Sequence, residues 1–149
     1  MSAVLTLGKV AHLEKLLPLC AAFHAEEGIA STEESRTAGL LPLLEGNPYG
    51  AIYLVGPPRA PIGYAVVCFG WSVEFGGLDA ILDELFVRPS VRGRGIATEV
   101  LISLPNALKE YGLRAIHLEV SGENDAAVKL YRKAGFEPRD QYMFMSRRL

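Results

Sequence analysis

The feature that most constrains this chain is a strand, a loop and a helix that follow one another between Leu82 and Ala97. Branched and aromatic residues over 81–87 favour a β-strand. Pro89 ends that strand, because proline cannot donate to a strand ladder. Two arginines and two glycines, Arg92-Gly93-Arg94-Gly95, then lie directly before a helical pattern. Free backbone N–H groups, the helix start and the arginine charges all favour an anion, so this stretch predicts a phosphate-binding loop.

A pair of carboxylates, Asp83 and Glu84, lies a few residues before this loop. The combination predicts an enzyme that holds a phosphorylated cofactor and performs acid–base chemistry beside it. Neighbouring side chains of a regular strand point to opposite faces of the sheet, so only one of the two carboxylates can reach a substrate. Glu84 becomes the stronger candidate only if a bulge reverses this alternation.

Length and composition predict a single domain over residues 1–149 with a substantial core. The formal net charge of −2 argues against a general nucleic-acid footprint. The longest apolar run, Ile62–Trp71, is too short to span a bilayer. The first residues lack the charged-then-apolar order of a signal peptide, so we expect no leader. Cys20 and Cys68 are expected to be buried free thiols, which suits a reducing cytoplasm.

The first half of the chain predicts two helices and a hairpin. A short strand is expected over Val4–Leu7, and helical spacing continues from Lys9 to Glu27, with Pro18 expected to kink or split that helix. Ser31 and Thr32 are the candidate caps of a second helix that continues to about Leu44. Turn residues separate the strands that follow, which are predicted over Ala51–Val55 and Pro61–Trp71.

The second half predicts a central strand, two helices and further strands. The central strand is expected over Leu78–Val87, and an amphipathic helix over Gly95–Tyr111 with a kink near Leu101, because Pro105 interrupts the helix. Alternation predicts a strand over Ala115–Val120, and Asn124 is the candidate cap of a short helix that ends at Gly135. Final strands are expected over Phe136–Pro138 and Gln141–Arg147. The order predicts a mixed α/β sheet with helices on its faces.

Two ordered motifs resemble the GNAT superfamily of CoA-dependent N-acetyltransferases. The phosphate loop of that family, Arg/Gln-x-x-Gly-x-Gly/Ala, is matched by Arg92-Gly93-Arg94-Gly95-Ile96-Ala97. The second signature is matched by Asn124, Ala127, Leu130, Tyr131, Lys133, Gly135 and Phe136. The match covers Leu82–Phe136, and Pro105 within the intervening helix is a departure from the pattern. The N-terminal third, which shapes the acceptor site in this family, has no specific match.

The resemblance implies the fold in more detail. It implies an α+β architecture with a mixed, mostly antiparallel central sheet flanked by helices. In the family the central strand and the next one splay apart to admit the cofactor arm. The resemblance also implies that acetyl-CoA is the co-substrate, that no metal is required, and that the reaction is acetyl transfer to a primary amine.

The resemblance assigns roles to particular residues. The backbone of the loop from Arg92 to Ala97, including Gly93, Arg94, Gly95 and Ile96, is expected to hold the CoA pyrophosphate. The backbone of Leu85, Phe86 and Val87 is expected to pair with the pantetheine arm as an added strand would. Other expected cofactor contacts come from the second motif, at Asn124, Ala127 and Lys133, although Asn124 is first of all a helix cap.

The expected catalytic residues are Asp83, Glu84 and Tyr131. An alkylamine has a pKa of about 10 and must lose a proton before it attacks a thioester. Members of the family most often place the active-site carboxylate at the position of Asp83. Tyr131 stands at the position of the family's acid, where it would donate a proton to the leaving thiolate; packing on the apolar face of its helix is the alternative. The three histidines do not cluster in the sequence, and no metal-ligand set is visible.

Two other functions compete with this prediction. A dinucleotide-binding domain is disfavoured, because Thr98 replaces the third glycine and the loop is too long for the required tight turn. The other rival keeps the fold and CoA binding but lacks catalysis and acts as a regulatory module. The acceptor, whether a small amine, a peptide or a protein lysine, stays open. An acidic stretch at Glu26, Glu27, Glu33 and Glu34 hints at a cationic amine, and homodimer formation through a sheet edge is compatible with the sequence but not required by it.

Overall fold

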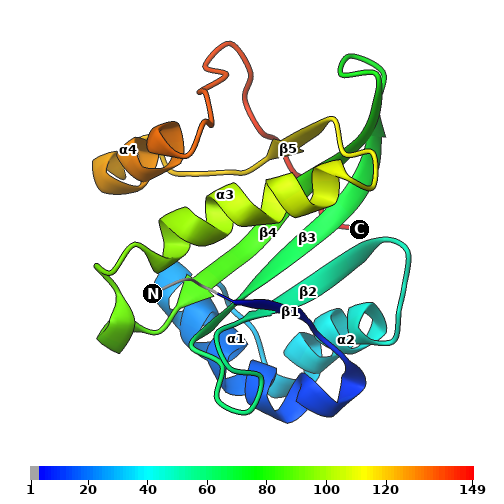
Figure 1. Cartoon of the computed structure of the whole chain (residues 1–149), viewed down its shortest axis with the longest axis vertical. Helices are drawn as coiled ribbons and strands as arrows, with labels where there is room; N and C mark the ends of the chain where they lie inside the picture. The colour runs from blue at the N-terminus through cyan, green and yellow to red at the C-terminus, as the bar shows by residue number, and fades with distance from the viewer. Residues whose placement is uncertain (1–3) are drawn as a thin grey trace.

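The computed structural model describes residues 4–149 as a five-stranded sheet between two layers of helices (Figure 1). Residues 1–3, part of the segment in which no signal peptide is expected, lie outside the described residues. The strands are β1 (Leu5–Leu7), β2 (Gly50–Val55), β3 (Gly63–Ser72), β4 (Gly77–Val87) and β5 (Ala115–His117). They lie side by side in this order, and every neighbouring pair is antiparallel except β4 and β5, which are parallel. The expected mixed, mostly antiparallel sheet is confirmed.

Helices α1 (Leu13–Glu27) and α2 (Glu33–Leu44) cover one face of the sheet. Their buried residues Leu16, Leu19 and Leu40 pack against Tyr64, Val66 and Phe86 of β3 and β4. Helix α3 (Ile96–Lys109) covers the other face, where Val100, Leu101, Leu104 and Leu108 pack against Val67, Ala80 and Leu82. The sheet therefore separates two cores (Figure 1). No helix of the described residues is long and apolar enough to cross a membrane.

The helix boundaries agree with the local signals in the sequence. Thr32 caps α2, because its Oγ1 accepts a hydrogen bond of 3.0 Å from the N–H of Ser35. A short 3₁₀ turn, Val10–His12, precedes α1, and Gly28 ends α1 in the left-handed conformation with φ 70°. The prediction that Pro18 could split its helix is wrong, because α1 continues through it. Burial of Leu16 and Leu19 offsets the hydrogen bond that proline removes. Helix α3 likewise continues through Pro105.

The C-terminal segment departs from the prediction. Helix α4 (Asp125–Lys133) is the last regular element among the described residues, so the strands expected over Phe136–Pro138 and Gln141–Arg147 are wrong. A run of apolar residues, 142–145, is present there, but Met143 and Met145 are 82% and 84% exposed. A strand needs a partner edge for its backbone hydrogen bonds as well as a suitable pattern. The neighbouring edge strand β5 is only 3 residues long, shorter than the expected Ala115–Val120.

Candidate active site

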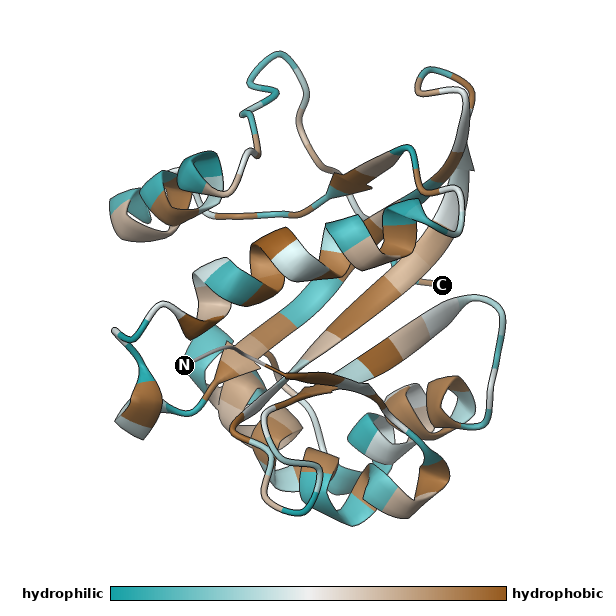
Figure 2. Cartoon of the chain, in the orientation of Figure 1, coloured by the Kyte–Doolittle hydropathy of each residue, from teal (hydrophilic) through white to brown (hydrophobic). Residues whose placement is uncertain are grey.

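A β-bulge in β4 places Asp83 and Glu84 on the same face of the sheet. Val67 of β3 pairs with Leu82, while Val66 pairs with Glu84, so Asp83 is an extra residue on β4. The alternation therefore reverses at this point, and Leu82 faces α3 whereas Glu84 faces α1 and α2. Both carboxylates therefore line one pocket, which regular alternation did not predict, and the bulge named in the sequence analysis as the condition that favours Glu84 is present. Asp83 and Glu84 interrupt the hydrophobic residues of the second half of β4, and a hydrophilic stretch is visible along this strand (Figure 2).

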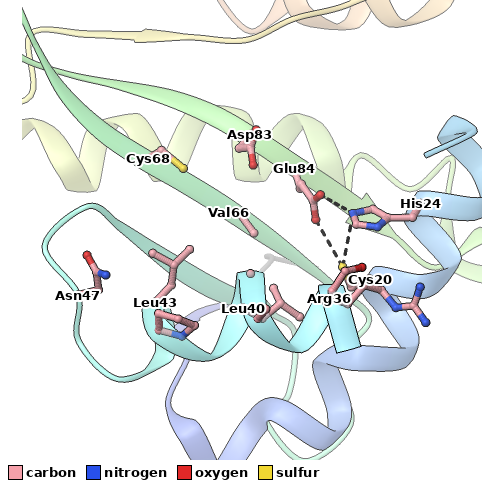
Figure 3. A pocket seen from close by; sticks show the side chains of 14 residues that line it. Cys20, His24, Arg36, Leu40, Leu43, Asn47, Val66, Cys68, Asp83 and Glu84 are labelled. Carbon is pink, nitrogen blue, oxygen red and sulfur yellow. Dashed lines mark hydrogen bonds and ion pairs between the residues drawn. The ribbon is translucent and has the colours of Figure 1, made fainter. Parts of the chain in front are cut away.

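Both carboxylates line a pocket of about 370 Å³ between the sheet and helices α1 and α2. The wall from α2 includes Arg36, Leu40 and Leu43, and β3 contributes Val66 and Cys68. Figure 3 shows Asp83 and Glu84 next to each other on the strand above the pocket, opposite α2. The acidic residues of the N-terminal half that hinted at a cationic substrate are not among the lining residues.

Glu84 is held by three donors. The hydroxyl of Tyr64 donates to Oε1 of Glu84 at 2.8 Å, and the thiol of Cys20 donates to the same oxygen at 3.7 Å. The ring Nε2 of His24 lies 2.6 Å from Oε2 of Glu84. Tyr64 is fully buried, and this burial, followed by the charge of Glu84, raises the pKa of its phenol well above the ordinary value. The phenol therefore stays protonated and continues to donate.

Asp83 has a different environment from that of its neighbour. Among the described residues, no side chain or backbone group makes a hydrogen bond to the carboxylate of Asp83. Asp83 is exposed to solvent at the pocket wall. Partial desolvation, and then the charge of Glu84, raises the pKa of the Asp83 carboxyl above its ordinary value, while His24 acts in the opposite direction. A free carboxylate with a raised pKa is a better proton acceptor than one whose oxygens are already occupied.

The network continues from His24 to α2. The Nδ1 atom of His24 lies 2.7 Å from Oγ of Ser31, and Nη1 of Arg36 donates to the same oxygen at 2.8 Å. An ionised carboxylate can only accept hydrogen bonds, so Nε2 of His24 carries a proton and donates to Glu84. The sequence showed only that the three histidines do not cluster, so this contact of His24 was not predicted.

The predicted phosphate loop forms a tight turn before α3. Gly93 and Gly95 adopt φ of 79° and 78°, and Gly95 is the N-terminal cap residue of α3. Within the described part of the chain, no hydrogen bond engages the backbone N–H groups of residues 93–98. The loop borders a cavity of about 380 Å³ lined by Val87, Arg92, Gly93, Gly95, Ile96, Ala97, Thr98 and Leu130. Free donors at a helix start beside a cavity suit an anion.

Arg92 is held by protein groups in this structure. Its two terminal nitrogens donate to the carboxylate oxygens of Glu26 at 2.6 and 2.7 Å, and its Nε donates to the carbonyl of Val87 at 2.8 Å. The guanidinium also lies 5.4 Å from the ring centroid of Phe86. The hydrogen bond from Arg92 lowers the pKa of Glu26. The charge of Arg92 is therefore balanced by α1, which leaves Arg94 as the arginine of the loop with no ion pair among the described residues.

The parallel pair β4 and β5 separates beyond the first residues. Pairing runs from Asp79 with Ala115 to Ile81 with His117 and then stops. Residues 82–87 of β4 consequently have no strand partner on this side among the described residues. Leu85, Phe86 and Val87 lie in this separated part, directly before the loop, as the predicted splayed pair requires. An unpaired edge of this kind can accept an extended ligand as an added strand.

Helix α4 carries the second motif at the far side of α3 (Figure 1). The side chain of Asn124 caps α4 by accepting a hydrogen bond of 3.1 Å from the N–H of Ala127, so its predicted capping role is confirmed. Tyr131 is half-buried against the core and contacts the ring of Phe136 edge-to-face, with centroids 6.2 Å apart. Burial, and then the charge of Glu27, raises the pKa of Tyr131. Lys133 is exposed, and its expected cofactor contact stays a prediction.

Sequence reasoning missed Cys20, His24 and Tyr64 as site residues. Cys20 and His24 are four positions apart on α1 and so share one face of that helix, which is a signal that the sequence contains. Nothing in the sequence shows that this face meets β4, because the contact joins residues about 60 positions apart. The bulge that turns Glu84 toward α1 has no local sequence signal either.

Comparisons with known proteins agree on one family. A model of the Acetyltransferase (GNAT) family matches residues 19–136. An uncharacterized N-acetyltransferase of Methanocaldococcus jannaschii is 32% identical over 81 residues, which are 54% of this chain and 36% of that protein. A thialysine N-epsilon-acetyltransferase of Bos taurus is 28% identical over 82 residues, 54% of this chain and 48% of that protein. The matched segment thus covers less than half of each of these relatives.

Solved structures resemble this fold over almost its whole length. An integron cassette protein from the mobile metagenome of Cole Harbour Salt Marsh has a TM-score of 0.83 and 28% identity, with 97% of this chain and 90% of that chain covered. An aminoglycoside N-acetyltransferase solved in complex with CoA has a TM-score of 0.78 and 19% identity, with 100% and 98% covered. At this level of identity, the second likeness shows the fold alone.

Proposed function

This chain belongs to the acetyltransferase (GNAT) family, and from that premise we propose that it transfers an acetyl group from acetyl-CoA to a primary amine held beside Asp83 and Glu84. One observation carries the proposal. The bulge brings both carboxylates to one pocket wall, two residues beyond the point where β4 separates from β5. A proton acceptor is therefore next to the strand edge along which the family's cofactor arm would lie.

The residues of the loop fit a CoA pyrophosphate. The unengaged N–H groups of residues 93–98 would bind its oxygens, and Arg94 would add a positive charge. The backbone of Leu85–Val87 would hold the pantetheine arm along the free edge of β4. When bound, the thioester of acetyl-CoA supplies the activated acetyl group.

Asp83 is the proposed proton acceptor. It takes the proton from the substrate ammonium group, directly or through a water molecule, because a neutral amine is required for attack on the thioester carbon. Glu84 keeps its negative charge and attracts the ammonium group, while its oxygens stay bound to Tyr64, Cys20 and His24. This division of roles rests on the hydrogen bonds that Glu84 accepts and those that Asp83 lacks within the described residues.

Tyr131 is the proposed proton donor to the leaving thiolate. Its raised pKa keeps the phenol protonated near neutral pH, as a donor must be. The preceding residue of the same helix, Leu130, lines the cavity beside the phosphate loop. Tyr131 does not line either pocket itself, so the proton transfer requires the thiolate to lie close to α4.

The acceptor is proposed to be a cationic primary amine. Two carboxylates line the pocket, and the one lining guanidinium, that of Arg36, is bonded to Ser31. The relatives of the chain include a thialysine N-epsilon-acetyltransferase, whose named substrate is an amine. The free thiols Cys20 and Cys68 suit a reducing compartment such as the cytoplasm.

The test is release of free thiol from acetyl-CoA in the presence of a panel of amines. The panel should contain diamines, amino acids, an aminoglycoside, and peptides with a free N-terminus or a lysine. We expect turnover with at least one cationic amine, and mass spectrometry should show that the product is larger by one acetyl group. Acetyl-CoA binding without turnover on any acceptor would instead favour the catalytically silent module.

A further inference from the structure

We propose that Cys20, His24 and Glu84 form a binding site for a zinc-like divalent cation, with its fourth coordination position open to the pocket. One ligand atom from each residue lies within 4.8 Å of the other two. Figure 3 shows the three side chains converging, two from α1 and one from β4. Sulfur, imidazole nitrogen and carboxylate oxygen are the three ligand types that zinc binds in proteins.

The spacing of the ligand atoms fits a tetrahedral metal. Ligands at the usual zinc distances of about 2.0–2.3 Å in a tetrahedron lie roughly 3.3–3.8 Å apart. Sγ of Cys20 lies 3.6 Å from Nε2 of His24 and 3.7 Å from Oε1 of Glu84, so two edges already have the required length. A metal would replace the hydrogen bond of 2.6 Å between Nε2 of His24 and Oε2 of Glu84. The distance between Nε2 and the carboxylate oxygen must then lengthen to that of a tetrahedral edge.

Two of the three ligands have hydrogen-bond partners of the kind that orient ligands in metal sites. A metal-bound histidine is usually oriented by a hydrogen bond at its other ring nitrogen, and here Nδ1 of His24 is bonded to Ser31 at 2.7 Å. Glu84 is oriented by the hydroxyl of Tyr64 at 2.8 Å. The side chains of His24 and Glu84 are only 13% and 15% exposed, and Cys20 is buried, so the ligands are fixed before a metal arrives.

Binding requires the loss of protons. Without metal, burial raises the pKa of the Cys20 thiol to about 11, so the thiol is protonated near neutral pH. The sulfur–metal bond forms as the S–H bond breaks, and the proton passes to solvent. The Nε2 proton of His24 leaves in the same way, since a metal needs the lone pair of that nitrogen. No change of oxidation state is involved.

A cation bound at this site would block the pocket proposed for the acceptor amine. This consequence rests on the proposed function. The cation would neutralise Glu84 and present its open coordination position beside Asp83. Zinc should therefore inhibit acetyl transfer competitively with the amine but not with acetyl-CoA, because the phosphate loop belongs to a separate cavity.

The test measures metal binding directly, without acetyl-CoA and on an untagged, chelator-treated chain. Titration with Co²⁺ should give one equivalent of binding with a strong thiolate-to-cobalt charge-transfer band, and Zn²⁺ should abolish that band by displacement. Cys20→Ser should lose the band, and His24→Gln should weaken zinc binding at least about tenfold, since even outer partners of a metal site contribute 10- to 100-fold. Cys68→Ser, which removes the other pocket thiol, should keep the band.

A wild-type measurement protects the test against variants that fail to fold. Extended X-ray absorption fine structure at the zinc edge of the loaded wild-type chain should show one sulfur ligand at about 2.3 Å and nitrogen or oxygen ligands at about 2.0–2.2 Å. No thiolate band, a band that depends on Cys68, or a zinc shell without sulfur would overturn the proposal. None of these results bears on acetyl transfer, which is measured separately in chelated buffer.

Discussion

Asp83 and Glu84 are adjacent carboxylates that differ in their hydrogen bonding. Glu84 accepts hydrogen bonds from three side chains, whereas the Asp83 carboxylate has none among the described residues. The pKa of Asp83 is raised, so its ionised form exists only above a pH higher than that of an ordinary aspartate. A general base must be ionised to act, so activity should rise with pH as Asp83 loses its proton.

Asp83→Asn should therefore lower kcat by about 100-fold or more at neutral pH, the usual contribution of a general base. In the plot of kcat/KM against pH, the variant should also lose the increase that the ionisation of Asp83 causes. The same acceptor amine is used for wild type and variant. The measurement is kcat/KM against pH for wild type and variant. Asp79→Asn is the control. Asp79 lies on the same strand but does not line the pocket, and its Oδ2 lies 3.2 Å from Nε2 of His117. An unchanged profile in Asp83→Asn would remove Asp83 from the mechanism.

Tyr131→Phe separates proton donation from packing. The variant keeps the ring that contacts Phe136 and loses only the hydroxyl. We expect kcat to fall about 100-fold while KM for acetyl-CoA stays within a factor of two, since an acid acts on the leaving group and not on binding. Tyr111→Phe, at an 80% exposed position, should change neither constant. Full turnover in Tyr131→Phe would leave packing as the role of this residue.

At the scale of elements, the loop before α3 depends on backbone conformation more than on side-chain volume. A Cβ at Gly95 would meet nothing within 4 Å, yet φ is +78°. Gly112, after the other end of α3, has φ of +95° and equally open surroundings. The two positions have the same kind of strain but differ in their distance from the proposed cofactor site.

Gly95→Ala and Gly112→Ala should each lower the free energy of unfolding by about 1–2 kcal/mol, the cost of a left-handed alanine. Only Gly95→Ala should also raise KM for acetyl-CoA, by about tenfold or more, because a displaced helix start misplaces the N–H groups. Denaturant unfolding and initial-rate kinetics measure the two effects. Equal KM values in both variants would contradict the proposed role of the loop.

At the scale of the whole molecule, the separation of β4 from β5 leaves a gap in an otherwise continuous sheet. The two cores meet only through this sheet, so a ligand that completes it stabilises both layers. A homodimer remains compatible with the sequence but not required by it, and the exposed segment around Met143 and Met145 is not a strand that could supply a sheet edge.

Acetyl-CoA at 100 times its Kd should raise the free energy of unfolding by about 2.7 kcal/mol through mass action. Hydrogen exchange should slow at the backbone amides of residues 85–87 and 93–98, where donors gain partners. Exchange in α2 should not change, which provides the internal control. Stabilisation without protection of these amides would place the cofactor elsewhere.

Features that depend on interactions within a few residues were predictable from the sequence. The phosphate loop, the capping residues Thr32 and Asn124, and the left-handed glycines are set within a few positions of the chain, so their patterns can be read directly. The order of strands and helices follows from periodicity for the same reason. The resemblance to the GNAT family rested on these local motifs, and the family comparison confirmed it.

Tertiary structure alone decided how the acceptor site is built. The bulge at Asp83 arises from pairing with β3, and it turns Glu84 to the face where Cys20 and His24 lie. The absence of C-terminal strands from the described residues likewise goes with the short partner edge at β5, which the local run of apolar residues does not reveal. These features join residues that are far apart in the sequence, and their free energies depend on contacts that no local pattern encodes.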